Sequence, residues 1–160
     1  MKGGASASGR TIAVCGPTDG AARVPLRGNL TGSLDNLSVA EREAVEYLLS
    51  QGRNVEIIPT AANRTPDFRV DGILTELKTI SGVANQTSDG LSAAMANRIM
   101  DGRGQASHIL VDVRGQPGMT QEIAERGVRR AYGADNRSGA RIQSIRIIGN
   151  GFDFTVRRMP

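Results

Sequence analysis

Lys78 is the residue whose type stands out most in this chain. The 160-residue sequence contains two lysines, Lys2 and Lys78, against eighteen arginines. An ammonium group is a compact point charge whose pKa its surroundings can tune, whereas a guanidinium is planar and stays protonated. We therefore interpret Lys78 as a residue with a role that arginine cannot fill. The alternative is a single lysine left by chance in an arginine-rich composition.

Two carboxylates are spaced so that they could meet Lys78. The segment from Ile73 to Ile80 is rich in aliphatic and β-branched residues and predicts a strand, in which Glu76 and Lys78 share one face. Asp71-Gly72 predicts a tight turn from a short preceding strand, and this hairpin would bring Asp67 level with Glu76. The alternative for this group is a structural salt bridge at a sheet edge.

A divalent cation would relieve the repulsion between Asp67 and Glu76. Mg²⁺ is typically held by one or two carboxylates together with water and substrate phosphate. The sequence therefore predicts a site for Mg²⁺, or Mn²⁺, at Asp67 and Glu76. There the ion would activate a water and offset charge on a scissile phosphate, while Lys78 orients the nucleophile or stabilises the transition state.

Glu41 is a candidate third ligand. The segment from Ser38 to Gln51 predicts a helix, with Ser38 as N-cap and Glu41 completing a capping box. At 3.6 residues per turn, Glu41 falls within the apolar stripe formed by Ala44, Val45, Leu48 and Leu49. An acid at this position could point toward the metal, or it could serve only as a helix cap.

This set of residues resembles the PD-(D/E)XK nuclease superfamily, with Glu41, Pro66-Asp67 and Glu76-Leu77-Lys78 as the matching positions. Roughly from Leu34 to Pro160, the chain is also similar to the carboxy-terminal toxin domains of contact-dependent growth inhibition effectors. The resemblance implies an α/β fold with a mixed central sheet flanked by helices, in a restriction-endonuclease-like core. It further implies a tRNA nuclease that is delivered from a producing cell, acts in the target-cell cytoplasm and is neutralised by a cognate immunity protein.

The carboxy-terminal part of the chain carries the positive charge. The net charge is +4, and from Gln121 onward eight arginines stand against four acids. Arg126, Arg129 and Arg130 fall on one predicted helix, where Arg126 shares a face with the other two by i,i+3 and i,i+4 spacing. We expect these arginines to bind a nucleic-acid backbone. The alternative is a solvated helix face followed by a basic tail.

Other residue types narrow the possible chemistry. A single cysteine, Cys15, excludes an internal disulfide and a zinc site, and a lone histidine, His108, argues against a histidine acid–base ribonuclease. His108 itself is expected to be a strand-edge residue. There is no tryptophan and few aromatic residues, so base stacking on aromatic side chains is a poor expectation. No stretch reaches the length of a membrane span, and no signal peptide is expected.

The chain is predicted to contain one folded domain, residues 34–160, after a linker or extension over residues 1–33 that is rich in Gly, Ser and Ala. One short strand, Thr11 to Cys15, is predicted within the linker. The predicted strands and helices of the domain alternate along the chain. In addition to those above they are Val55 to Ile58, Phe68 to Val70, Leu91 to Met100, His108 to Val113, Thr120 to Tyr132, Ile142 to Ile148 and Phe152 to Val156.

The sequence thus favours a metal-dependent endoribonuclease toxin that cleaves tRNA. Two alternatives remain open. One is a DNA endonuclease with the same fold, and the other is a non-catalytic nucleic-acid-binding module in which Glu76 and Lys78 form a structural ion pair. Dependence of cleavage on divalent ions separates the two nucleases from the binding module.

Overall fold

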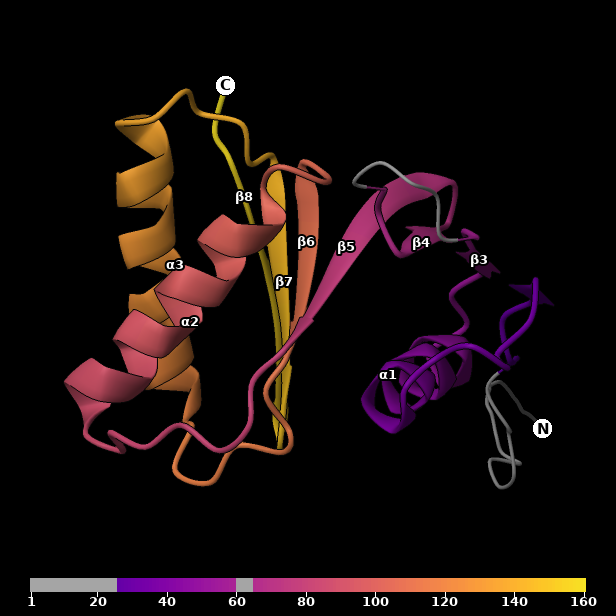
Figure 1. Ribbon diagram of the computed structural model, residues 1–160, viewed down its shortest axis with the longest axis horizontal. Coiled ribbons are helices and arrows are strands. Elements are labelled where there is room, and N and C mark those ends of the chain that lie inside the picture. Colours follow the sequence, from indigo (N-terminus) through magenta and orange to yellow (C-terminus); the bar gives the residue numbers. More distant parts are fainter. Residues whose placement is uncertain (1–25, 60–64) are drawn as a thin grey trace, which may run out of the picture.

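The computed structural model describes residues 26–59 and 65–160, which form a mixed α/β fold around one seven-stranded sheet (Figure 1). The strands follow one another across the sheet in chain order. Parallel pairs join β2 to β3, β5 to β6 and β6 to β7, and the other neighbours are antiparallel. The strands are β2 Leu30–Thr31, β3 Val55–Ile57, β4 Phe68–Val70, β5 Ile73–Thr79, β6 His108–Asp112, β7 Ser144–Gly149 and β8 Phe152–Arg157.

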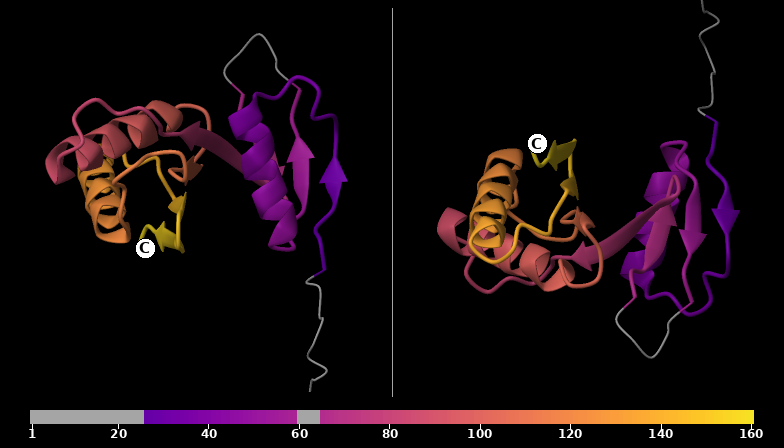
Figure 2. Two further views of the ribbon diagram at one scale, coloured as in Figure 1. Left: turned by 90° about the horizontal axis from the view of Figure 1, so that it is seen from below. Right: turned by 90° about the horizontal axis from the view of Figure 1, so that it is seen from above.

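Three helices cover the two faces of this sheet unequally. Helix α1 (Val39–Ser50) packs on one face, while α2 (Ser88–Gly102) and α3 (Gln121–Asn136) pack together on the other. In Figures 1 and 2 the long strand β5 runs between the part of the sheet that carries α1 and the part that carries α2 and α3. No helix that the structure describes is long and apolar enough to cross a membrane.

Side chains alternate along the central strands and so supply two separate cores. Leu77 and Leu110 point toward α1, where they meet the buried stripe predicted from the helix periodicity. Ile109 and Val111 point the opposite way and pack against α2 and α3. A central strand with both faces covered therefore has few solvent-exposed positions, and any polar side chain on it is either paired or functional.

Each helix begins at a residue whose side chain caps it. Ser38 accepts a hydrogen bond from the backbone N–H of Glu41 at 3.2 Å, and the Glu41 carboxylate accepts one from the backbone N–H of Ser38 at 2.9 Å, which completes the predicted capping box. Thr87 and Thr120 cap α2 and α3 in the same way. Because Thr87 is the cap, α2 begins at Ser88, three residues earlier than predicted.

Helix α3 ends four residues later than predicted, and Asp135 provides the reason. Its buried carboxylate accepts the backbone N–H groups of Arg141 and Ile142 at 3.1 and 2.9 Å. It also pairs with Arg103 and Arg158. These partners compensate the cost of burying the Asp135 charge in the last helical turn. Helix propensity alone does not predict them, because they come from residues outside the helix.

A short strand precedes residue 34, the predicted start of the folded domain. Leu30–Thr31 is the edge strand β2, parallel to β3, and the backbone N–H of Gly28 donates to Leu49 O at 2.9 Å. A Cβ atom at Gly28 would lie 1.8 Å from the carbonyl oxygen of Arg53, so only glycine allows this close approach. Local composition suggested a linker because glycine and polar residues dominate here. The strand predicted over Thr11 to Cys15 lies outside the described residues.

Candidate active site

The β4–β5 hairpin determines where Asp67 lies. Asp71 and Gly72 have φ values of 49° and 84°, the left-handed conformation that a tight hairpin turn requires at both central positions. The resulting register pairs Phe68 with Thr75, so Asp67 comes next to Glu76. The Asp67 carboxylate accepts a hydrogen bond from the backbone N–H of Leu77 at 3.0 Å, which holds it in this position.

Glu76 and Lys78 form an ion pair on the face of β5 that carries α2 and α3. The Lys78 Nζ lies 2.7 Å from Glu76 Oε1. Glu76 is almost completely buried, at 1% exposure, whereas 16% of the Lys78 side chain is exposed. Lys78 therefore reaches from a buried carboxylate toward solvent.

The two oxygens of Glu76 differ in their surroundings. Oε1 accepts from both Lys78 and Gln105, whose Nε2 lies 2.8 Å away. Oε2 is buried and has no hydrogen-bond partner among residues 26–59 and 65–160. Burial raises the pKa of Glu76; Lys78 opposes this shift and the negative charge of Asp67 adds to it. A buried carboxylate oxygen without a donor is costly, and a cation between Glu76 and Asp67 would relieve that cost.

These side chains line two adjoining cavities. One of about 420 Å³ contains Asp67, Glu76 and Lys78 in its wall, and a second of about 590 Å³ extends from it. Glu41, Asp67 and Gln105 border both cavities. The space next to the carboxylates is therefore large enough for a metal ion, its water ligands and a phosphate group.

Glu41 lies in the wall of both cavities from the start of α1. One oxygen of its carboxylate, Oε2, already accepts the backbone N–H of Ser38 and caps the helix, so a metal would have to compete with this hydrogen bond. Within the described ranges, no three acidic, histidine or cysteine side chains are close enough together to hold a metal ion. The structure thus brings Asp67 and Glu76 into a pair, which fits the demand of Mg²⁺ for one or two carboxylates. It does not add Glu41 to them as a third member.

Two residues of the site were missed by sequence reasoning. Gln105, which follows α2, holds Glu76 Oε1 from 29 positions away along the chain. Gly102 is the last residue of α2, and a Cβ atom there would lie 3.1 Å from Glu76 Cγ and 3.2 Å from Lys78 Cε. The helix predicted over Leu91 to Met100 stops short of Gly102, so the prediction gave this glycine no role. In the structure it lets α2 pass close to the ion pair.

Comparison with protein families decides the classification of the chain. Residues 64–154 match the model of the contact-dependent growth inhibition CdiA C-terminal domain, more than half of the 160 residues. The chain belongs to this family. The match includes Asp67, Glu76, Lys78 and Gln105, whereas Glu41 lies before it. The domain is accordingly a toxin domain of a bacterial competition effector.

One solved structure is similar to this CdiA C-terminal domain, a CdiA-CT/CdiI toxin and immunity complex from Burkholderia pseudomallei. The similarity covers 82% of this chain and 100% of that chain, with a TM-score of 0.49 and 16% sequence identity. Comparison with curated proteins gave no match.

The three arginines predicted to bind nucleic acid do not form one free basic face of the toxin domain. Arg126 and Arg130 both pair with Asp89 at the start of α2, at 3.2 and 2.9 Å. Arg129 is exposed and borders a separate cavity between α3 and β8. None of the three lines the cavities that contain Asp67 and Glu76. Their role in binding nucleic acid stays a prediction. The charges of Arg126 and Arg130 are partly compensated by Asp89.

Proposed function

We propose that this domain is a metal-dependent endoribonuclease toxin of the PD-(D/E)XK type that cleaves tRNA. The observation that carries the proposal is the buried Glu76 carboxylate. One of its oxygens is held by Lys78 and Gln105 and the other has no partner in the described part of the chain, beside Asp67 and next to an open cavity. A pair of this kind fits a hard divalent cation.

Asp67 and Glu76 would hold Mg²⁺ or Mn²⁺, and Glu41, which caps α1 and borders the same cavities, would contribute through a water. When bound, the ion would supply an activated water and offset negative charge on the scissile phosphate. Leu77 supports this role of Asp67, because its backbone N–H holds one carboxylate oxygen of Asp67 at 3.0 Å. Gln105 supports the role of Glu76 in the same way, because it binds Oε1 and leaves Oε2 toward the metal.

Lys78 would act on the reacting phosphate. Its ammonium reaches the cavity while it stays 2.7 Å from Glu76 Oε1, so its direction is fixed before a substrate arrives. A positive group held in this way can orient an attacking water or stabilise the charge of the pentavalent transition state without reorganisation. Arg98, which lines the same cavity, is exposed and could contact a neighbouring phosphate.

The choice of tRNA, the cognate immunity protein and delivery into the target-cell cytoplasm are proposed from membership in the CdiA C-terminal domain family. A neutralising partner would need to block or distort the cavity at Lys78, or compete for the basic surfaces of the domain. The net charge of +4 favours an acidic partner in either case.

The test is incubation of the purified domain with total tRNA and with plasmid DNA, each with Mg²⁺ and with EDTA. We expect cleavage of tRNA that EDTA abolishes. Cleavage of plasmid DNA in preference to tRNA would instead assign the domain to the DNA endonucleases. Binding of RNA without cleavage under any metal condition would mean that Glu76 and Lys78 form only a structural ion pair. Asp67→Asn, which keeps the size of the side chain, is the matched inactive control.

A further inference from the structure

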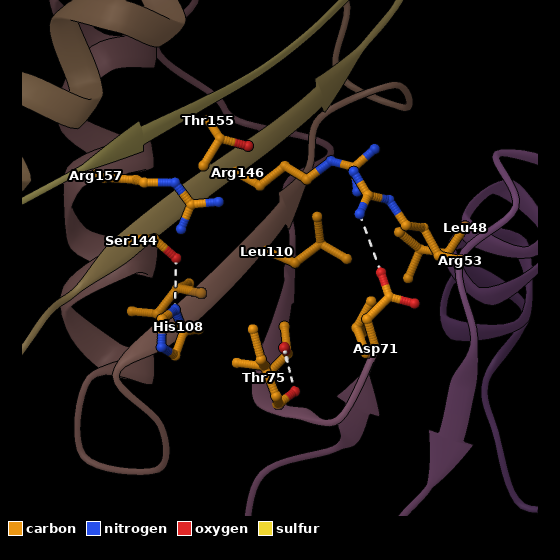
Figure 3. Close-up of a pocket in the computed structure, with 13 residues that line it drawn as sticks. Leu48, Arg53, Asp71, Thr75, His108, Leu110, Ser144, Arg146, Thr155 and Arg157 are labelled. Atoms are coloured by element: carbon orange, nitrogen blue, oxygen red, sulfur yellow. Dashed lines mark hydrogen bonds and ion pairs between the residues drawn. The ribbon is translucent and has the colours of Figure 1, made fainter.

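A second polar cavity of about 200 Å³ lies on the opposite face of the sheet from Glu76 and Lys78. Figure 3 shows side chains from separate strands and from the loop before β3 converging on it. Its polar lining consists of arginines, hydroxyl groups, one aspartate and the only histidine of the chain. These residues are Arg53, Asp71, Thr75, His108, Ser144, Arg146, Thr155 and Arg157.

This groove exists because α1 covers only part of its face of the sheet. The helix packs on Leu77, Leu110 and Ile148, and Leu48 is its residue at the edge of the groove. Beyond Leu48, no helix of the described residues packs on the remaining side chains of β6, β7 and β8 on this face, because α2 and α3 lie on the other face (Figures 1 and 2). A sheet face open to solvent is normally polar, and here the polar side chains that line the groove include three arginines.

The charges in the groove are not balanced. Arg53 pairs with Asp71 at 3.0 Å and Arg146 with Asp153 at 2.7 Å. Arg157 makes no ion pair with any residue in the part of the chain that the structure describes. The groove therefore keeps one uncompensated guanidinium, in contrast to Arg126 and Arg130, which share Asp89.

Neutral donors surround that guanidinium. His108 Nδ1 lies 2.7 Å from Ser144 Oγ, and Arg157 is opposite Ser144 in the strand register. Burial lowers the pKa of His108 and the positive charge of Arg157 lowers it further, so the imidazole is neutral at pH 7. One guanidinium with a hydroxyl and an imidazole beside it offers charge-assisted and neutral hydrogen bonds to a small oxyanion, and the cavity volume suits one phosphate group.

We propose that this groove binds a phosphate group of the RNA backbone, with Arg157 as the principal contact and Ser144 and His108 beside it. The assignment to RNA rests on the nuclease function proposed above. His108 follows Gln105 by three residues, so at most about 11 Å of chain separates the groove from the cavity of Glu76. A single RNA strand that passes over this loop can touch both sites.

His108 makes the proposal directly measurable, because it is the only histidine in the chain and gives one imidazole signal in a proton NMR spectrum. The probes are a short single-stranded RNA in EDTA, which prevents cleavage, and inorganic phosphate. We expect RNA to raise the pKa of His108, because a bound phosphate stabilises the imidazolium. Arg157→Ala is expected to abolish this response and to weaken RNA binding on the order of tenfold, the value of a charge-assisted hydrogen bond.

Two controls keep the result interpretable. Arg157→Ala without ligand should itself raise the pKa of His108, but by less than unfolding does, because burial is the larger cause of the lowered pKa and remains in the folded variant. Circular dichroism of the variant checks that it is folded. Arg137→Ala removes the same charge from an exposed arginine at the end of α3 that lines neither cavity, and it should leave both the response of His108 and the RNA affinity nearly unchanged. Arg157→Lys should restore part of the affinity.

The proposal is overturned if Arg137→Ala and Arg157→Ala weaken RNA binding equally, or if RNA leaves His108 unchanged. A response of His108 to inorganic phosphate with none to RNA would likewise overturn it, and the groove would then be a site for a free anion. Cleavage plays no part in this measurement. Failure of the nuclease proposal would appear instead as EDTA-resistant cleavage, or as cleavage by Asp67→Asn, with the behaviour of His108 unaffected.

Discussion

Replacing Lys78 by arginine is the sharpest test of the candidate active site, because it keeps the charge and changes only its shape. In the structure, Lys78 Nζ lies 2.7 Å from Glu76 Oε1. The Cε atom of Lys78 lies 3.2 Å from the position of a Cβ atom at Gly102, so the α2 backbone closes the site on that side. A guanidinium is larger and planar, and cannot occupy this position without displacing Glu76 or the end of α2.

The size of the effect follows from these contacts. Loss of one fixed positive donor at a developing charge lowers cleavage about 10²- to 10³-fold, and we expect Lys78→Arg to approach Lys78→Ala in this respect. Overpacking beside Gly102 should also cost about 1–3 kcal/mol of unfolding free energy, which lowers the melting temperature by several degrees.

The assay is the initial rate of tRNA cleavage in Mg²⁺ for the parent, Lys78→Arg and Lys78→Ala, with thermal unfolding of each protein measured in parallel. Lys78→Met is the control for size, since it keeps the length of the stem without the charge. If Lys78→Arg cleaves within a few-fold of the parent, Lys78 is only an electrostatic partner of Glu76 and the reasoning from its shape is wrong.

Three further predictions concern the neighbouring groups. Because the pKa of Glu76 is raised above its ordinary value near 4.5, its ionisation destabilises the fold at higher pH. Glu76→Gln should therefore raise the melting temperature at pH 7 to 8, and thermal scans should show this gain shrinking as the pH falls through the raised pKa toward 4.5. Asp67→Ala should abolish cleavage and leave RNA binding intact or tighter in binding isotherms, since a negative charge leaves the phosphate site; weaker binding would contradict the assignment. Arg126→Ala and Arg130→Ala should each reduce the log–log salt slope of RNA binding by clearly less than the roughly one unit of a full phosphate contact, because Asp89 already compensates them. A loss of a full unit for either would show that the ion pairs open on binding.

Many features of this domain could be predicted because they depend on residues close together in the chain. The capping box of Ser38 and Glu41 needs only a spacing of three residues. The left-handed turn at Asp71-Gly72 needs only two suitable residues, and strand alternation then places Glu76 and Lys78 on one face. These local rules predicted the neighbours of Lys78 before any tertiary contact was known.

Contacts between distant segments were not accessible in this way. Asp89 and Arg130 are 41 positions apart, and no local pattern indicates that α2 and α3 cross at these residues. The sequence therefore predicted a free basic face where the tertiary structure pairs two of its three arginines. For the same reason Leu30–Thr31 was assigned to a linker, since a two-residue strand is stable only through the neighbour to which it is hydrogen-bonded.

The types and spacing of Asp67, Glu76 and Lys78 were thus determined by the sequence alone, through turn geometry and the period of a strand. Only the tertiary structure decided which oxygen of Glu76 lacks a partner among the described residues, because Gln105, which follows α2, binds Oε1 and not Oε2. It also decided that Arg126 and Arg130 share Asp89, while Arg157 forms no ion pair among the residues that the structure describes. Charge compensation depends on which side chains the packed fold brings within a few ångströms of each other, and spacing along one segment does not encode this.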